Sequence, residues 1–338
     1  MKSYRVTMTP LEPYFFGNEK TFAFSGAEKS AKNKYLIKSE EKPSQSTILG
    51  TLRYLLMPVK KADWSYSADE KKQNAETVGE NGFIPYKECD FGKIKSISPV
   101  FLYKDGDYLV QCPFDHIVKD KDGNLNKYYV PFSEYEETLD KKKKYAKDFV
   151  AKDGLADSFL RLSDKAVIPK EAVIINDERV GINRGQEKDG FFKKEYCMLA
   201  DGYSFAFYVE LDDDIEPEDT IAFCGQGKSS FSVVFTSEEN IVEEQAKKWM
   251  RDDIVYIWGD TFIQSSVYDK CFFAAAKTKT YRHYKKENGR VSKGGILYNL
   301  LASGSVLMPY ENADIINDIE KESFKKAGYN KAIIKNRG

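Results

Sequence analysis

Residues 43–57 carry the strongest helix signal in the chain, and a proline stands at each boundary of the segment. Its apolar residues recur at the period of an α-helix and share one face. They are Ile48, Leu49, Leu52, Leu55 and Leu56. Ser44 or Ser46 can cap the start, and Pro58 ends the helix because it lacks a backbone N–H and disfavours helical geometry at Met57. The segment predicts a capped core helix that follows a strand at residues 4–8 and an aromatic–glycine turn at residues 11–17.

The start of this helix is also a candidate phosphate site. A helix N-terminus exposes unpaired backbone N–H groups and carries a partial positive charge, so it attracts anions. The residues around it are rich in hydroxyl groups, which can add hydrogen bonds to a phosphate. An ordinary capped core helix with no ligand is the alternative interpretation.

The composition is that of a globular protein with more than one core. The chain has 338 residues, of which 41% are hydrophobic and 31% charged, and two domains are expected at this length. No apolar run approaches the roughly 20 residues that a membrane span needs, and the N-terminus lacks a signal-peptide core, so we expect a cytoplasmic protein. The five cysteines are scattered and form no metal-binding pattern. We therefore expect neither a metal nor a cofactor.

The charged residues are unevenly distributed along the chain. The formal net charge is only −1, so a nucleic-acid-binding protein of this composition needs a local basic surface. Residues 277–293 supply one, with seven Lys or Arg residues against one Glu, and with Tyr281, His283 and Tyr284 among them. Basic side chains neutralise phosphates and aromatic rings stack on bases, which favours RNA binding. A solvated loop that contacts nothing is the alternative.

Strand and helix signals recur in both halves of the sequence, which predicts an α+β fold with antiparallel sheets and helices on one face. Residues 60–95 and 104–158 are charge-rich and irregular, and we interpret them as insertions or long loops. Helices are predicted at residues 238–250 and 313–327, the second with Ile315, Ile316, Ile319 and Phe324 inward and Gly328 after its end. The other predicted strands are 172–175, 203–211, 231–235, 271–276, 305–310 and 332–334. Residues 220–224 form an apolar segment, and residues 254–258 are a strand or a helix end.

Gly227-Lys228-Ser229 has the ending of a phosphate-binding P-loop, but two features argue against this motif. Its first glycine would have to be Ala222, and the segment that follows is β-branched and aromatic instead of helical. A glycine-rich turn between an apolar segment and a strand fits better, and its backbone can approach a sugar-phosphate chain closely.

Four segments, taken in order, resemble the RAMP superfamily of CRISPR effector proteins. They are the turn at 11–17, the proline–serine helix start at 43–53, the central hairpin at 179–192 with the strand at 203–211, and the Gly-Ser-Val strand at 302–307. The glycine-rich loop at 225–228 lies where the family has such a loop. The likeness is strongest to the Cmr-complex subunit of type III-B systems that holds the 5′ tag of the guide RNA.

The resemblance implies two ferredoxin-like (RRM-like) domains with long charged insertions and glycine-rich loops. Residues 1–237 would form the first domain and residues 238–338 the second. It also implies a non-catalytic subunit that anchors the crRNA 5′ tag beside the large polymerase-like subunit and the backbone RAMP subunits, and that meets target RNA only indirectly. These complexes act in antiviral defence.

The resemblance and the residue chemistry together assign candidate RNA contacts. Ser44, Ser46 and Thr47 would hold a tag phosphate, Arg53 would pair with the next one, and Tyr14 or Phe16 would stack on a base. The remaining candidates would follow the sugar-phosphate chain or the bases. They are Arg179, Asn183, Arg184, Gln226, Gly227, Lys228, Lys277 and Arg282.

A metal-independent endoribonuclease that processes crRNA precursors is the alternative function. Some RAMP proteins have this activity, often with histidine as general acid or base. The chain offers only His116 and His283, and His283 lies among basic and aromatic residues that could serve attack by a 2′-hydroxyl.

Overall fold

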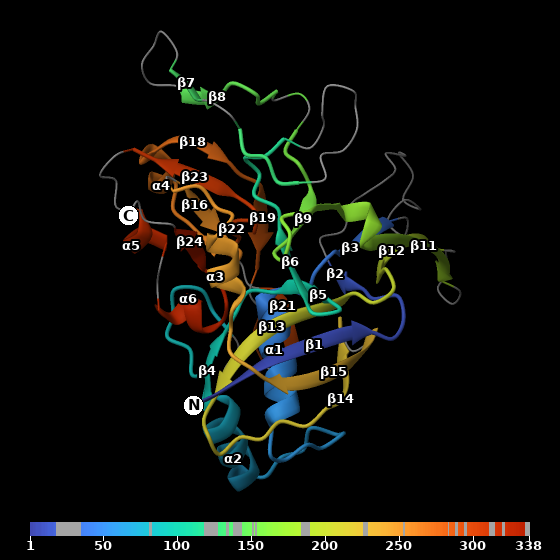
Figure 1. The fold of residues 1–338 in the computed structure, drawn as a ribbon. Coiled ribbons are helices and arrows are strands. Elements are labelled where there is room, and N and C mark those ends of the chain that lie inside the picture. The colour runs from blue at the N-terminus through green and yellow to red at the C-terminus, as the bar shows by residue number, and fades with distance from the viewer. Residues whose placement is uncertain are drawn as a thin grey trace.

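A nine-stranded antiparallel sheet, called here the main sheet, forms the centre of the protein in a computed structural model (Figure 1). The structure describes residues 1–17, 35–80, 83–117, 128–132, 135–137, 144–150, 152, 154–183, 190–225, 229–252, 254–282, 284–287, 290–293, 296–310, 315–319 and 322–334. Eight strands of the main sheet follow the order β10-β9-β6-β5-β13-β1-β15-β14, and β4 also pairs with β13. Their bounds are β1 Lys2–Pro10, β4 Ile94–Ile97, β5 Phe101–Lys104, β6 Asp107–Gln111, β9 Ser158–Arg161, β10 Val167–Pro169, β13 Ser204–Leu211, β14 Thr220–Cys224 and β15 Ser229–Ser237.

Three smaller sheets surround the main sheet. One contains β2 (Phe16–Gly17), β3 (Tyr35–Glu40), β11 (Ile174–Asn183) and β12 (Gly190–Leu199). The other two are built from C-terminal strands: β16 (Val255–Ile257), β18 (Cys271–Ala275), β23 (Val306–Pro309) and β24 (Ala332–Ile334) in one, and β17 (Thr261–Phe262), β19 (Thr278–Tyr281) and β22 (Tyr298–Leu301) in the other. Two isolated hairpins are β7 (Tyr135–Glu137) with β8 (Lys144–Ala146), and β20 (Tyr284–Glu287) with β21 (Arg290–Lys293).

The helices are few and mostly short. They are α1 (Gln45–Leu56), α2 (Ala68–Val78), α3 (Val242–Lys247), α4 (Ser266–Asp269), α5 (Ile316–Ile319) and α6 (Glu322–Lys326), with a 3-10 turn at Lys170–Ala172. Among the described residues, no helix combines the length and the apolar character needed to cross a membrane.

The central strand β13 is buried on both faces, which explains its continuous apolar sequence. Phe205 and Phe207 point to one face and pack in the same cluster as Ile48 of α1. Ala206 and Tyr208 point to the other face and pack with residues of α3, β16, β23 and β24. The main sheet therefore lies between α1 and the C-terminal sheet that contains β16, β23 and β24. Segments from both halves of the chain pack on it.

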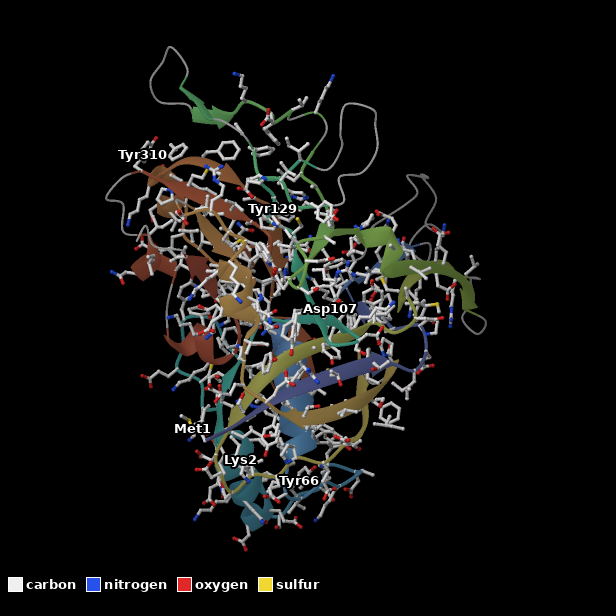
Figure 2. All side chains as sticks on the ribbon, viewed as in Figure 1. Met1, Lys2, Tyr66, Asp107, Tyr129 and Tyr310 are labelled. Atoms are coloured by element: carbon white, nitrogen blue, oxygen red, sulfur yellow. The ribbon has the colours of Figure 1, made fainter. Side chains whose placement is uncertain are left out.

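Strand β1 runs along the middle of the main sheet, between β13 and β15. Val6 and Met8 alternate into the core, as the period of a half-buried strand requires. Met1 and Lys2 lie at the same end of the molecule as Tyr66 (Figure 2), and the other end of β1 leads to β2.

Helix α1 confirms the prediction for residues 43–57. Ser44 is its N-cap, and its apolar stripe is buried at Ile48, Leu49 and Leu52. Each fully buried side chain of this size contributes roughly 1.5–3 kcal/mol, so the stripe fixes the helix firmly on the sheet.

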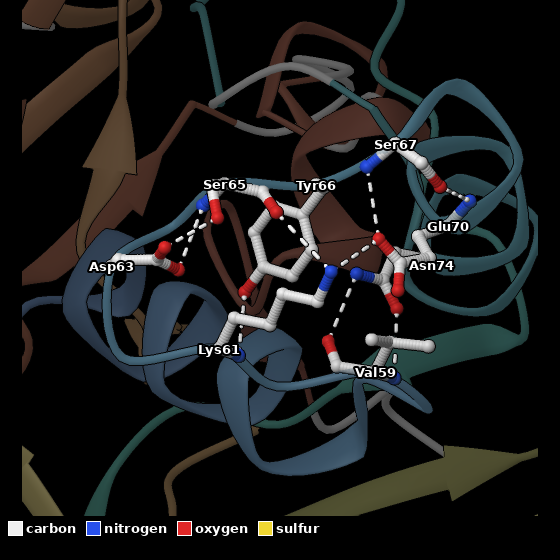
Figure 3. A network of polar contacts seen from close by, with 8 residues as sticks. All are labelled: Val59, Lys61, Asp63, Ser65, Tyr66, Ser67, Glu70 and Asn74. Atoms are coloured by element: carbon white, nitrogen blue, oxygen red, sulfur yellow. Dashed lines mark hydrogen bonds and ion pairs between the residues drawn. The ribbon is translucent and has the colours of Figure 1, made fainter.

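The segment at 60–95, expected to be irregular, contains an ordered helix (Figure 3). Ser67 and Glu70 form a capping box at the start of α2, and Glu70 also pairs with Lys61 at 2.7 Å. The Asn74 side chain bonds both the N–H and the C=O of Val59, at 3.1 and 3.0 Å. Polar contacts hold this region together instead of an apolar stripe, which is why hydrophobic periodicity did not reveal it.

Three other predictions need correction. The interpretation of residues 104–158 as an insertion or long loop is wrong in part, because β6 and the start of β9 are integral strands of the main sheet. The helix predicted at 238–250 is limited to α3. The single helix predicted at 313–327 contains two short helices, α5 and α6, and Ile316 is exposed instead of inward. Gly328 has the expected left-handed conformation, with φ +81.

His116 lies in the interior, 3% exposed, and its ring is 5.8 Å from that of Tyr129, which Figure 2 labels. Its Nδ1–H donates to the carbonyl of Pro113, and its Nε2 is buried without a hydrogen-bond partner among the described residues. Burial lowers the pKa of His116 to about 4. The folded state therefore holds this ring neutral.

Acidification is expected to destabilise the protein through His116. The unfolded chain takes up this proton below its ordinary pKa of about 6.5, whereas the folded protein resists until about pH 4. Between these values stability falls by about 1.4 kcal/mol per pH unit, or roughly 3 kcal/mol in all. Denaturant titrations of the wild type and His116→Gln at pH 7 and pH 4 measure this loss. Equal losses in both proteins would contradict it.

Candidate nucleic-acid interface

A cavity of ≈ 770 Å³ opens where the start of α1 meets the β2–β3 hairpin and the C-terminal strands. We call it the central cavity. Its volume lies within the roughly 300–1,000 Å³ of pockets that enclose small organic ligands. Its lining residues are Phe16, Gly17, Glu40, Lys42, Pro43, Ser44, Gln45, Ser46, Thr47, Pro99, Val100, Gly225, Trp258, Gly259, Asp260, Thr278, Lys279, Thr280, Tyr281, Arg282, Leu300, Ser303 and Tyr329.

The N-terminus of α1 contributes a cluster of hydroxyl groups to this cavity. The Ser44 Oγ accepts from the Thr47 N–H at 3.3 Å and lies 3.0 Å from the Ser46 Oγ and 2.9 Å from the Thr47 Oγ1. The Ser46 N–H donates to the Tyr329 hydroxyl at 3.2 Å. The helix end is thus positioned by contacts from both ends of the chain, with its hydroxyls at the cavity.

Gln45 fixes this helix start to the rest of the protein. Its side-chain amide is buried and donates to the carbonyls of Ser98, at 2.9 Å, and Ala327, at 3.1 Å. Gly328 lies so close that a Cβ there would come within 1.8 Å of the Gln45 Nε2. The absence of a side chain at Gly328 is therefore what permits this contact.

Charged side chains of both signs line the central cavity. Asp260 accepts from the Ser303 N–H at 2.9 Å and pairs with Lys279 at 3.2 Å. Burial disfavours both charges, but Lys279 still holds the pKa of Asp260 below its ordinary value, and Asp260 and Glu40 raise the pKa of Lys279. The opposite charges of Asp260 and Lys279 therefore stabilise each other inside the cavity.

Glu40 and Lys42 are different, because neither side chain makes an ion pair or hydrogen bond with any described residue. Burial raises the pKa of Glu40, although the nearby Lys279 charge opposes this shift, and Asp260 adds to it. Burial, followed by the proximity of Lys279, lowers the pKa of Lys42. Lys42 lies with its Nζ 5.8 Å from the centre of the Phe159 ring, which is a weak contact for a cation.

Aromatic residues form much of the remaining wall. Phe16 stacks on Phe231 with ring centroids 5.8 Å apart, and Tyr281 meets Phe262 edge to face at 5.4 Å. Trp258 is 2% exposed, and its indole N–H has no hydrogen-bond partner among the described residues. The cavity thus combines cationic groups, hydroxyls and aromatic surfaces, which are the groups that bind single-stranded nucleic acids.

The structure brings five of the predicted contacts together at this cavity: Phe16, Ser44, Ser46, Thr47 and Arg282. Gly225, at the start of the predicted glycine loop, also lines it. Gly225 has φ +61, and a Cβ there would lie 2.0 Å from the carbonyl of Phe15, so this turn requires glycine.

Two predicted contacts do not fit the structure. Tyr14 is fully buried in the core, and its hydroxyl donates to the Glu41 carbonyl at 2.8 Å, so it cannot stack on a base. Arg53 donates to the carbonyl of Asp90 and lies 5.8 Å from the Phe91 ring, away from the cavity. Burial lowers the pKa of Arg53.

The remaining predicted contacts lie elsewhere or outside the described residues. Arg179 is on the β11–β12 hairpin, where it pairs with Asp177 at 2.8 Å and covers the Tyr196 ring at 4.9 Å. Asn183 ends β11. Lys277 lies next to the lining residue Thr278, 3.4 Å from Asp157 and 4.7 Å from the Phe114 ring. Outside the described residues are Arg184, Gln226, Gly227, Lys228 and His283.

Sequence reasoning missed several lining residues, chiefly Glu40, Lys42, Asp260 and Lys279. Lys279 lies inside the basic stretch at 277–293, so the sequence indicates its charge but not its position at the cavity. Lys42 directly precedes the Pro43-Ser44 helix start, and this adjacency is the one sequence feature that could have indicated that Lys42 lies at the cavity. Within the described residues, no group of three or more His, Cys, Asp or Glu side chains could hold a metal ion.

Comparisons with known proteins give consistent matches. The model of a family described as CRISPR-associated protein (Cas_Cmr3) matches residues 6–250. A chain in a structure of type III-B Cmr-beta bound to cognate target RNA and AMPPnP superposes with a TM-score of 0.53 at 13% identity, covering 97% of this chain and 95% of that one. A second, bound to cognate target RNA, has a TM-score of 0.53 at 14% identity, covering 98% and 96%.

A chain of the Csm3–Csm4 subcomplex from a type III-A interference complex matches more weakly, with a TM-score of 0.38 at 10% identity over 91% of this chain and 92% of that one. No curated protein matches the sequence significantly. At these identities the structural likeness concerns the fold alone, while the family model concerns the sequence itself.

Proposed function

Because the chain belongs to the Cas_Cmr3 family of CRISPR-associated proteins, we propose that its central cavity holds the 5′ tag of a crRNA in a type III-B effector complex. The observation that carries this proposal is the meeting of the α1 N-terminus, cationic side chains and aromatic walls in one cavity. Phosphates would lie at Ser44, Ser46 and Thr47 and beside Lys42. Bases would lie against Phe16 and Tyr281.

In this proposal the subunit binds RNA without cutting it. The large polymerase-like subunit and the backbone RAMP subunits would lie beside it, and target RNA would reach it only through the complex. His116 is a poor general acid or base, because it is buried and its pKa is lowered to about 4. The cavity offers the RNA fixed polar and aromatic contacts.

The proposed domain organisation is two ferredoxin-like units, at residues 1–237 and 238–338. The strand pairing supports it, since β16, β17, β18, β19, β22, β23 and β24 pair, within the described residues, only with strands that also lie after residue 238. The two units would share the buried surface around Tyr208 and Tyr256. The central cavity, lined from both sides of residue 238, would lie between them.

Ultraviolet cross-linking tests this function directly. The full chain is co-expressed with its effector subunits and a CRISPR array, irradiated, digested and examined by mass spectrometry, and the attached RNA is sequenced. We expect cross-links on the peptides that carry Phe16 and Tyr281, since aromatic residues in contact with bases react most readily. The attached RNAs should share one 5′ end. Cross-links confined to the β11–β12 hairpin, or RNAs without a common 5′ end, would contradict the proposal.

A further inference from the structure

Glu40 and Lys42 differ from their neighbours in the sequence, because neither side chain makes an ion pair or hydrogen bond with a described residue. Lys38 pairs with Glu195 at 3.2 Å, and Glu41 pairs with Lys170 at 2.9 Å. Glu40 and Lys42 line the cavity and make no such contact with the described residues. Within residues 38–42, the structure therefore pairs two charges that do not line the cavity and leaves the two that line it without an ion pair among the described residues, whereas the lining residues Asp260 and Lys279 pair with each other.

Without an ion-pair partner among the described residues, these two charges cost stability in the free protein. Both side chains are partly buried, and burial penalises each charged form. They are also not close enough to form an ion pair with each other. A ligand that presents hydrogen-bond donors to the carboxylate and an anion to the ammonium group would satisfy both at once.

A guanine nucleotide has this combination of groups. An ionised carboxylate only accepts hydrogen bonds, and it has two oxygens side by side. The Watson–Crick edge of guanine presents two adjacent N–H donors, N1–H and N2–H, which match those oxygens. Cytosine offers one amino group beside an acceptor, adenine offers the same arrangement, and uracil offers a single imino N–H. The phosphate of the same strand would supply the anion for Lys42.

The position of Glu40 suits the reading of a base edge. Glu40 pairs with Phe16 across the β2–β3 ladder, so the two side chains share one face and both line the cavity. A base that packs against the Phe16 wall would turn its edge toward the carboxylate. The N-terminus of α1 begins five residues after Glu40 and lies at the same cavity, where it can hold the flanking phosphates.

We infer that Glu40 is a specificity-determining residue that reads the Watson–Crick edge of a guanine in the bound RNA, with Lys42 paired to a phosphate of the same strand. This inference rests on the proposed function, because it requires RNA in the central cavity. It adds a base preference to a site otherwise built for phosphates and stacking.

Binding of short RNAs with a single variable base tests the inference. Fluorescence anisotropy of the full chain is measured with labelled eight-nucleotide uridine RNAs that carry one central guanine, inosine, adenine or cytosine. We expect the guanine RNA to bind about 10- to 100-fold more tightly than the adenine RNA, as bidentate base contacts do. Inosine keeps N1–H but lacks the N2 amino group, so its affinity should be intermediate.

Two variants with a matched control separate specificity from affinity. Glu40→Gln and Glu40→Ala should abolish the preference for guanine over inosine while affinity for plain uridine RNA stays within about threefold. Glu41→Gln is the control, since Glu41 pairs with Lys170 instead of lining the cavity. Tight binding without a base preference, or a preference that survives in both Glu40 variants, would overturn the inference alone. Absence of RNA binding, or binding that Lys42→Met leaves unchanged, would overturn the proposed function as well.

Discussion

Lys42→Met should weaken RNA binding about 10- to 100-fold and at the same time raise the stability of the free protein. The ammonium group is partly buried without a compensating partner among the described residues, and its pKa is lowered. Removing it therefore relieves a desolvation cost in the folded state. In the RNA complex the same group would form a charge-assisted bond to a phosphate, worth roughly 1.5–3 kcal/mol, and this bond is lost.

Fluorescence anisotropy at several salt concentrations and denaturant unfolding measure both effects. The slope of log affinity against log salt should decrease by about 0.7, the value for one phosphate contact on a single strand. Lys72→Met is the control, because Lys72 lies exposed on α2 and does not line the cavity. A variant that binds RNA normally, or that is less stable than the wild type, would show that Lys42 has a structural role instead.

Gly328→Ala is expected to destabilise the protein by roughly 3–6 kcal/mol. The added methyl group would lie 1.8 Å from the Gln45 Nε2 and 2.8 Å from the Ser98 carbonyl, so the Gln45 side chain must move. Its two hydrogen bonds, to Ser98 and Ala327, would then be lost inside the core. Overpacking, the unpaired carbonyls and the unfavourable positive φ each add about 1–2 kcal/mol. Denaturant unfolding measures the sum.

Gly106→Ala is the matched control for this substitution. Gly106 also has a positive φ, +90, but a Cβ there would have no neighbour within 4 Å. Gly106→Ala should lower the free energy of unfolding only by the cost of a non-glycine residue at positive φ, about 1–2 kcal/mol. Equal losses in the two variants would mean that the contact between Gln45 and Gly328 contributes nothing. Because that contact holds the α1 start, Gly328→Ala should also weaken RNA binding in the fraction that remains folded.

The part of the candidate site that could be predicted from the sequence is the part encoded locally. The α1 start is fixed by residues 43–57 themselves, through a serine cap, an apolar stripe and flanking prolines. Arg53 is predicted to pair with the next phosphate, but helix geometry alone places it far from the helix start. It lies eight residues beyond Gln45, or roughly 12 Å along the helix axis at 1.5 Å per residue. The structure accordingly places it against Asp90 instead.

The rest of the site depends on contacts between distant segments. Glu40 and Asp260 are separated by 220 positions in the numbering and approach only because the β2–β3 hairpin and the C-terminal strands border one cavity. Nothing in the local sequence of either residue specifies that approach. Tyr14 and Phe16 show the same limit. Both aromatic side chains of this turn are buried, 0% and 6% exposed, but only Phe16 also lines the cavity.

The elements that could be predicted from the sequence are those with a clear pattern of apolar residues. Elements that are held by polar contacts could not be predicted in this way. The strand at 203–211 was visible because β13 is apolar on both faces. Helix α2 was missed because its buried residues are Asn74, Thr77 and Val78, which form no apolar stripe. Its start is specified by the Ser67–Glu70 capping box, a short signal within a charged segment.

The order in which the lining residues leave the ribosome has a consequence for biogenesis. Phe16 emerges more than three hundred positions before Tyr329, whose hydroxyl accepts from the Ser46 N–H. A nascent chain that stops before Tyr329 therefore lacks part of the cavity wall. Guide capture at this cavity would require that synthesis has passed Tyr329.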